Sequence, residues 1–335
     1  MNRNKIYKDI DVTKDHILNK TVGIIGYGSQ ARAQALNLRD SGAKVLIGLR
    51  ANSKSINLAK KDAFKDILSI TNLCIKADII SILIPDEEIP NVFINSIEHN
   101  LEKGKTILFS HGYSVYFNKI NLPKRINVIM VAPSGAGKMV RKNFINGSGI
   151  PNLIAVHQDY TKDAFDIALS YSKYIGGTKV GSFLSTFKEE VVTDLFGEQA
   201  ILTGGIPTLI KESFNALVSK GYNPTVAWFV CYYEVKAIID LFYDKGFEFL
   251  NDSISNVAEY GGFSKGEFLI DESFKDKLSS MINDIENGKF EKDWSNEKDS
   301  NNNKYLNFKR KETIDSNIEK LNRKLLAIIN SNNKK

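Results

Sequence analysis

Short apolar runs alternate with longer amphipathic stretches from Thr21 to about Gly181. The runs are rich in β-branched residues, a pattern typical of parallel strands that are buried on both faces and separated by helices. We therefore predict an α/β region of doubly wound type. Its predicted strands are residues 21–25, 44–47, 78–84, 106–110 and 127–131.

The pattern changes at Phe187, where the strand signals stop and apolar residues recur at helical spacing. Helices are predicted over residues 189–202, 206–220 and 225–245, so an all-helical domain follows the α/β region. Beyond Met281 the chain turns polar and rich in Asn, Lys and Asp. For this tail we predict a mobile loop and then a last helix around residues 314–329.

Composition excludes several classes of protein. The 335 residues, 42% hydrophobic and 25% charged, are typical of a globular chain of two domains. No apolar stretch approaches the ~18 residues of a membrane helix, and the basic start lacks the apolar segment of a secretory signal. Two cysteines without CxxC spacing, Cys74 and Cys231, predict neither a disulfide framework nor a zinc site, and favour a reducing, cytoplasmic location. The net charge of +6 comes from basic residues dispersed among acidic ones, so no nucleic-acid partner is expected.

A glycine-rich turn, Gly26-Tyr27-Gly28-Ser29-Gln30-Ala31, follows the first predicted strand and opens a helix that runs to Gly42. Gly26 would allow the tight turn, Gly28 would let the backbone approach a pyrophosphate, and Ala31 would permit close helix packing. This context predicts a dinucleotide site. The alternative is a glycine turn that binds no ligand.

The second predicted strand ends in Arg50, where an NAD-binding sheet would carry an acidic residue for the ribose hydroxyls. Ser53 and Ser55 follow closely. A guanidinium and two hydroxyls suit a 2′-phosphate through charge-assisted hydrogen bonds, so we predict NADPH as the cofactor. The alternative is that these three are ordinary loop residues.

Three carboxylates, Glu190, Asp194 and Glu198, recur four residues apart and would project from one face of a helix. Their sequence neighbours are largely apolar, so we expect buried carboxylates, which hold a metal or stay protonated. Hard oxygen ligands favour Mg²⁺. Glu234, on a second apolar helix, is a further candidate, although a surface pair with Lys236 is the alternative.

His111 lies just past a predicted strand, at the edge of the sheet where cofactor and substrate meet in such folds. A catalytic and a structural role are both compatible with this position. His16, His99 and His157 lack such a context, and we assign them no role.

Together these residues resemble the short, class I form of the ketol-acid reductoisomerase family, which makes dihydroxy acids for branched-chain amino acids. The resemblance runs from about Lys5 to Gly262. It rests on the glycine turn with the following Ala-Leu-Asn-Leu-Arg-Asp-Ser-Gly, and on residues 131–133, 153–159, 186–190, 193–199 and 253–261.

The resemblance implies an N-terminal Rossmann-type, NADP-binding domain (1–185) and a C-terminal all-helical domain (186–335) that interlocks with a second copy in a knotted homodimer. It implies that Asp194 and Glu198 bind magnesium beside Glu190, that His111 is the active-site histidine, and that Glu234 and Ser255 come from the partner subunit as a ligand of a second metal and a substrate contact. The implied NADPH contacts are Tyr27, Gly28, Ser29, Gln30, Arg50, Ser53, Ser55, Asp86 and Gly137.

Three positions depart from the family pattern. Ser134 stands where the family has a lysine that contacts metal-bound water and substrate oxygens. Val230 replaces one of two glutamates for the second metal, and Val192 replaces an acidic residue between Glu190 and Asp194. The magnesium site is therefore expected to be weakened.

The family reaction joins an alkyl migration, which needs two metals, to a hydride transfer. The departures affect the migration, whereas the NADPH residues are intact. We therefore expect a reductase of a small 2-keto or cyclic imino acid, with catalytic residues His111, Ser134, Glu190, Asp194, Glu198, Glu234 and Ser255. The alternatives are a full reductoisomerase that converts 2-acetolactate to 2,3-dihydroxy-isovalerate, with Lys138 reaching the site, and a non-catalytic NADPH-binding protein.

Overall fold

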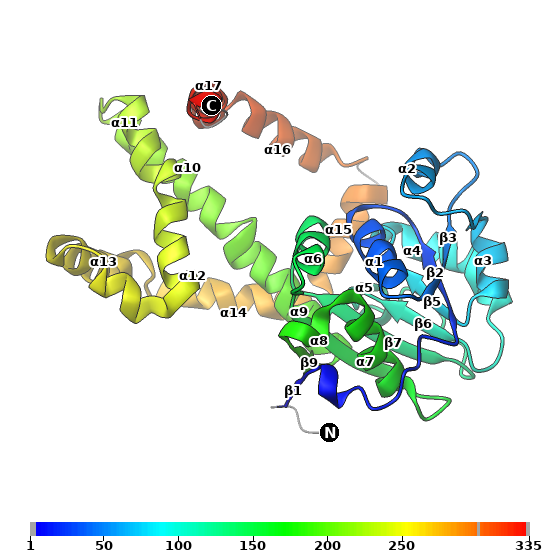
Figure 1. The fold of residues 1–335 in the computed structure, drawn as a ribbon. Helices are drawn as coiled ribbons and strands as arrows, with labels where there is room; N and C mark the ends of the chain where they lie inside the picture. The colour runs from blue at the N-terminus through cyan, green and yellow to red at the C-terminus, as the bar shows by residue number, and fades with distance from the viewer. Residues whose placement is uncertain (1–4, 300–301, 333–335) are drawn as a thin grey trace. The chain divides into compact units, whose positions relative to one another are not determined.

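The computed structural model describes residues 5–299 and 302–332 (Figure 1). The chain divides into two compact units, Met1–Val191 and Val192–Lys335. The division lies inside helix α9 (Phe187–Gly197), so this helix belongs in part to each unit.

The first unit is built on one sheet, which has nine strands in the described part of the chain. Their order across the sheet is β1-β9-β8-β7-β6-β5-β2-β3-β4. The strands are β1 (Ile6–Tyr7), β2 (Thr21–Ile25), β3 (Lys44–Gly48), β4 (Ile67–Leu68), β5 (Ile79–Ile82), β6 (Thr106–Phe109), β7 (Asn127–Pro133), β8 (Asn152–Gln158) and β9 (Ser182–Leu184).

All five predicted strands are confirmed, and they pair in parallel as β3-β2-β5-β6-β7. The sheet also contains two antiparallel pairs that the sequence did not predict, β7 with β8 and β1 with β9. Apolar periodicity reports burial and carries no information on strand direction. Strands β1, β4 and β9 have two or three residues each, too few to leave a period-2 signal.

Helices cover both faces of this sheet (Figure 1). Side chains of α1 and α7 pack with Ile24 and Ile47 in one core, and side chains of α3 and α5 pack with Ile25 and Ile80 in the other. The helices of this unit are α1 (Ser29–Asp40), α2 (Ser55–Lys61), α3 (Ile70–Lys76), α4 (Ile89–Val92), α5 (Tyr113–Tyr116), α6 (Gly137–Ile145), α7 (Ala164–Ile175) and α8 (Gly177–Val180). Shorter turns are η1 (Asp9–Asp11), η2 (Asp86–Glu88), η3 (Phe93–Ile97) and η4 (Glu98–Asn100).

The second unit is helical throughout its described residues, as predicted. One hydrophobic core cluster of this unit contains Phe214, Ala227, Trp228 and Ile318, and the side chains of Trp228 and Phe214 are fully buried in it. Its elements after α9 are η5 (Glu198–Leu202), α10 (Gly205–Ser219), α11 (Pro224–Trp228), η6 (Phe229–Tyr233), α12 (Val235–Asp252), α13 (Asn256–Leu269), α14 (Glu272–Glu286), α15 (Lys289–Asp299), α16 (Lys304–Asp315) and α17 (Asn317–Asn332).

The predicted mobile loop after Met281 is wrong, since the described residues of this tail form helices α14, α15 and α16 ahead of the last helix. Charged side chains one turn apart support these helices. Lys275 pairs with Glu272 in α14 at 2.6 Å, and Lys309 pairs with Glu312 in α16 at 2.7 Å. The polar composition therefore reflects solvated helix surfaces. Among the described residues, no helix combines the length and apolar character needed to cross a membrane.

Candidate active site and cofactor site

The glycine turn between β2 and α1 has the geometry that its sequence predicts. Gly26 has a φ of +99°, and a Cβ there would lie 2.4 Å from the carbonyl oxygen of Leu83, so only glycine fits. Gly28 caps α1, and no atom lies within 4 Å of a Cβ built on it. The first turn of α1 has no acidic residue. The start of this helix therefore suits an anionic pyrophosphate.

A second close approach joins the glycine turn to the loop after β7. A Cβ on Gly137 would lie 2.2 Å from the carbonyl oxygen of Ser29. The Gln30 side chain donates to the carbonyl oxygen of Gly135 at 2.7 Å. Ser134, in the same loop, is exposed. The contacts hold this loop at the carboxyl end of β7, beside the residues expected to bind the cofactor.

The three residues predicted to recognise a 2′-phosphate lie around one pocket. Arg50, Ser53 and Ser55 line it together with the glycine turn. The backbone N–H of Ser53 donates to the carbonyl oxygen of Arg50 at 3.0 Å, and the Ser53 hydroxyl accepts from the N–H of Ser55 at 3.3 Å. A cationic group and two hydroxyls on one pocket fit a phosphorylated ribose.

Other residues of this pocket were not predicted. They lie at the carboxyl ends of β3 and β5, at the start of α3, in η2 and in α4, and most of them are apolar or glycine, which gives no sequence signal for a ligand. They are Gly48, Leu49, Ile70, Leu83, Ile84, Pro85, Glu88 and Val92. Asp86 begins η2 directly after the pocket residue Pro85, and its cofactor contact stays a prediction.

His111 follows β6 and lies against the first turn of α9. Its Nδ1 is 2.8 Å from Oε1 of Glu190, and the backbone N–H of Gly112 donates to Oε2 of Glu190 at 2.8 Å. Glu190 is 4% exposed. A Cβ on Gly112 would lie 2.9 Å from Val191 and 3.0 Å from Phe187. Glycine at position 112 therefore lets this loop pack directly on α9, a requirement that sequence reasoning missed.

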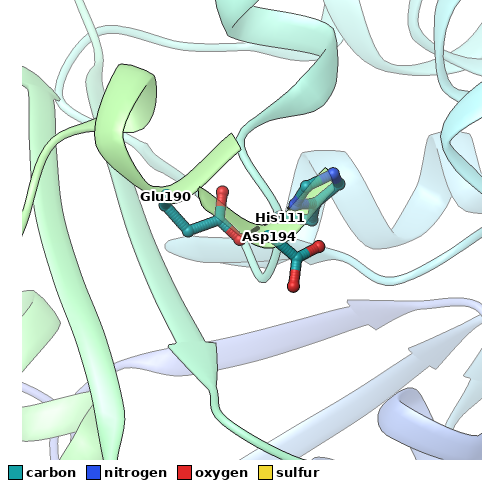
Figure 2. Close-up of side chains that lie close together, drawn as sticks. All are labelled: His111, Glu190 and Asp194. Carbon is teal, nitrogen blue, oxygen red and sulfur yellow. Dashed lines mark hydrogen bonds and ion pairs between the residues drawn. The ribbon is translucent and has the colours of Figure 1, made fainter. Parts of the chain in front are cut away.

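Asp194 lies one helical turn beyond Glu190. Ligand atoms of His111, Glu190 and Asp194 all lie within 4.8 Å of one another, and Figure 2 shows their side chains gathered together. Within residues 5–299 and 302–332, these three form the one group of at least three His, Cys, Asp or Glu side chains that could hold a metal ion. The structure therefore brings together three of the predicted site residues.

The predicted burial is right for Glu190 and wrong for Asp194 and Glu198, which are exposed. The apolar neighbours Val191 and Leu195 are buried, but each lies about 100° around the helix from the carboxylate before it. Apolar neighbours in sequence therefore do not bury this acidic face. Glu198 begins the π-helix η5, so the change of pitch comes after the three carboxylates.

Glu234 and Ser255 belong to the second unit, and both are exposed. Glu234 lies where η6 meets α12, and the Ser255 hydroxyl caps α13 by accepting from the N–H of Ala258 at 3.3 Å. Lys236 pairs with Asp240. The metal and substrate roles of Glu234 and Ser255 stay predictions.

A buried polar network supports the strand end that carries His111. Gln34, fully buried on α1, donates to the hydroxyl of Ser110 at 3.0 Å and accepts from the hydroxyl of Tyr171 at 2.9 Å. Burial raises the pKa of Tyr171, so its hydroxyl stays a donor.

Lys138, the lysine that could replace the family's catalytic lysine, lines a pocket with Ser29 and Arg141. Among the described residues that line this pocket, none belongs to the cluster of His111, Glu190 and Asp194.

Comparisons with known proteins agree over both units. A family model described as acetohydroxy acid isomeroreductase, NADPH-binding domain, matches residues 16–181, and one described as ketol-acid reductoisomerase, C-terminal domain, matches residues 187–331. The chain is 48% identical, over 88% of its length and 89% of the relative, to a protein named ketol-acid reductoisomerase (NADP(+)) from Methanocaldococcus jannaschii. It is 42% identical to the protein of the same name from Clostridioides difficile, over 97% of this chain and 98% of that protein.

A solved structure titled as an NADH-preferring ketol-acid reductoisomerase from an uncultured archean has a TM-score of 0.90 at 37% identity, covering 96% of this chain and 98% of that one. These findings confirm the Rossmann-type sheet followed by a helical domain, the NADPH cofactor and the expectation of an oxidoreductase. This chain belongs to the ketol-acid reductoisomerase family.

Proposed function

We propose that this chain uses NADPH to reduce the C=O or C=N bond of a small 2-keto acid or cyclic imino acid, with little or no alkyl migration. The observation that carries the proposal is Ser134, an uncharged side chain in the loop after β7. Strand β7 pairs with β6, which leads to His111, so Ser134 lies in the loop next to that of His111, where the family resemblance implies a lysine. Val230 and Val192 remove two further charged groups that the family uses or carries at its metal site.

The residues on the first unit fit NADPH. The amide groups at the start of α1 would bind its pyrophosphate, and Arg50 with Ser53 and Ser55 would bind its 2′-phosphate. Tyr27, Gln30, Asp86 and Gly137 are further proposed contacts. When bound, NADPH supplies the hydride that converts the C=O or C=N bond to an alcohol or an amine.

Reduction adds a hydride to carbon and a proton to oxygen or nitrogen, and an imine takes up that proton before the hydride to become the cationic C=N group. His111 is the proposed proton donor. Glu190 faces Nδ1, so the opposite ring nitrogen, Nε2, would hold the proton that passes to the substrate. The buried carboxylate also stabilises the charged imidazolium. The negative charge of Asp194 would stabilise a cationic C=N group directly, which favours the imine over the ketone.

The residues also fit Mg²⁺, because Asp194 presents an exposed carboxylate beside the oxygens of Glu190. Glu198 and Glu234 are the other proposed ligands. When bound, Mg²⁺ would polarise an oxygen of the substrate. Since Val230 supplies no oxygen, we propose that any second metal binds weakly.

A homodimer is part of the proposal. The second unit exposes large apolar side chains on α12 and α13, including Tyr243, Phe247, Val257, Tyr260 and Phe268, all at least 71% exposed. Exposed apolar surface of this extent is typical of a protein interface. A second copy of this chain is the proposed occupant, and it would bring Glu234 and Ser255 toward the site as the family resemblance implies. From the cysteine usage we also keep the prediction of a cytoplasmic location.

The second candidate is the full reductoisomerase reaction, favoured by the 48% identity to a protein of that name. It requires another cation in place of Ser134. Lys138 lines the pocket beside Ser29 and Arg141, which argues against that substitute. A non-catalytic NADPH-binding protein is the third candidate.

The deciding experiment follows NADPH oxidation with Mg²⁺ and each of three substrates: 2-acetolactate, a 2-keto acid and a cyclic imino acid. The proposal predicts reduction of the keto or imino acid and a rate on acetolactate at least ~100-fold lower. Equal rates on acetolactate and the keto acid would establish the full reaction. NADPH binding without oxidation of any substrate would establish the non-catalytic protein.

A further inference from the structure

Asp62 joins the glycine turn, α1 and α2 through its carboxylate. Arg32 of α1 donates to both oxygens, from Nε to Oδ2 at 2.6 Å and from Nη2 to Oδ1 at 2.8 Å. The hydroxyl of Tyr27 in the glycine turn donates to Oδ2 at 2.9 Å. The Asp62 side chain is 12% exposed. Residues 27, 32 and 62 therefore form a clamp, held together by one nearly buried carboxylate.

The backbone after Asp62 is held by the same part of the chain. Arg39 of α1 donates to the carbonyl oxygen of Asp62, and its guanidinium lies 5.1 Å from the ring centre of Phe64. The ring of Phe64 packs edge-on against Tyr27 at 5.9 Å. Ala63, between them, has a φ of +66°, a conformation that a non-glycine residue adopts when its surroundings impose it.

The charges of the clamp persist at neutral pH. Hydrogen bonds from Arg32 hold the pKa of the Asp62 carboxyl below its ordinary value. Burial, with the hydrogen bond to Asp62, raises the pKa of the Tyr27 hydroxyl. Tyr27 thus stays a donor and Asp62 stays an acceptor over the range in which the enzyme works.

Asp62 does not line the pocket around Arg50, Ser53 and Ser55, but it lines a neighbouring pocket together with Tyr27 and Arg32. It directly follows α2, a helix of seven residues whose first residue is Ser55. A short rigid helix that is fixed at its last turn is also fixed at its first. We propose that Asp62 is a positioning residue that holds α2, and with it the 50–55 segment, at the distance from the glycine turn that NADPH requires.

This inference rests on the proposed binding of the 2′-phosphate by Arg50, Ser53 and Ser55. It predicts that loss of the clamp weakens NADPH more than NADH, because NADH has no phosphate for this segment to grip. The experiment measures the Kd of NADPH and of NADH for the full chain by titration calorimetry, without any substrate. The variants are Asp62→Asn, Arg32→Met and, as the matched control, Asp66→Asn, which removes an exposed carboxylate four residues away.

We expect Asp62→Asn and Arg32→Met to raise the Kd of NADPH about fivefold or more, the effect of weakening one charge-assisted hydrogen bond, and that of NADH less than about twofold. Arg32→Lys, which keeps the charge, should recover part of the loss. Asp66→Asn should bind both cofactors as the unmodified chain does. If Asp62→Asn fails to fold, Arg32→Met carries the comparison, since Arg32 is 44% exposed.

Equal weakening of both cofactors, or no change in either, would mean that the clamp serves the fold alone and would overturn the inference. Arg50→Ala separates this failure from a failure of the proposed phosphate site. If Arg50→Ala abolishes the preference for NADPH and Asp62→Asn does not, the phosphate site stands and only the positioning role is lost. If neither variant changes the preference, the phosphate is bound elsewhere.

Discussion

Glu190 contacts His111 through one carboxylate oxygen, at 2.8 Å, while its other oxygen accepts the backbone N–H of the next residue, Gly112. Both the ring and the loop that carries it are thus held by one buried side chain. This arrangement selects the tautomer with the proton on Nδ1 in the neutral ring and stabilises the imidazolium when Nε2 also gains a proton.

Glu190→Gln is expected to lower kcat by about 10- to 100-fold, because an amide keeps the shape but removes the charge that stabilises the imidazolium. The Kd of NADPH should stay unchanged, since Glu190 is not in the cofactor pocket. Steady-state rates on the best substrate and a cofactor titration measure both effects. The matched control is Glu189→Gln, an exposed neighbour, which should keep the unmodified rate. A Glu190→Gln rate equal to that of the control would remove His111 from the proposed chemistry.

Arg50→Ala is expected to raise the Kd of NADPH by about 10- to 100-fold, the worth of a charge-assisted hydrogen bond of about 1.5–3 kcal/mol. The Kd of NADH should change little. Fluorescence titration of each cofactor gives the ratio. Lys54→Ala, which removes an exposed cation within the same segment but outside the described pocket lining, is the control and should keep the preference for NADPH.

Asp62→Asn is expected to lower the free energy of unfolding by about 1 kcal/mol at pH 7, a small value because Arg32 is partly exposed and solvent screens the pair. The pKa of Asp62 is lower in the folded chain, so its contribution is complete above the unfolded pKa of ~3.9 and is lost as the pH falls through the folded pKa. Urea unfolding should show a constant difference from pH 7 to 5 that shrinks below about pH 4. A difference that grows in acid would contradict the pairing.

These residues also show how far the sequence could predict the site. The glycine turn and His111 were predictable, because each needs only a buried strand followed by a special residue type. The clamp was not, since Arg32 and Asp62 are 30 positions apart and only the folded chain brings them together. The exposure of Asp194 and Glu198 was also not predicted. Their spacing shows that they share one face of a helix, but it does not show whether another part of the protein covers that face.

A homodimer predicts a mass of at least twice 37.5 kDa by light scattering at micromolar concentration. Phe247→Asp should weaken the association by about 2 kcal/mol or more, roughly 30-fold in Kd, because it puts a charge in a buried interface. Ile10→Asp, at an apolar residue of the first unit that is 88% exposed against 71% for Phe247, should leave the mass unchanged. A monomer at these concentrations would exclude the proposed interface.

The double variant Ser134→Lys with Val230→Glu tests whether the departures suppress the isomerisation. It places a cation and a carboxylate where the family resemblance implies a proton-handling lysine and a ligand of the second metal, the two groups that we propose the alkyl migration needs. We expect the rate on 2-acetolactate with Mg²⁺ to rise at least ~100-fold, since one such group is worth several kcal/mol in the transition state. The rate on a ready-made 2-keto acid should change by less than about threefold, because hydride transfer uses residues that both proteins share.

The two single variants show whether the groups act together. Each alone should recover little, because a lysine without the second metal, or a metal without the lysine, leaves the migrating substrate incompletely held, and groups that act on one step are not additive. Ser148→Lys, which adds the same charge at an exposed position of the first unit, is the control and should not gain activity on acetolactate. If the unmodified chain already converts acetolactate as fast as it reduces the keto acid, Ser134 and Val230 do not limit the migration and the ordinary family reaction is the function of this chain.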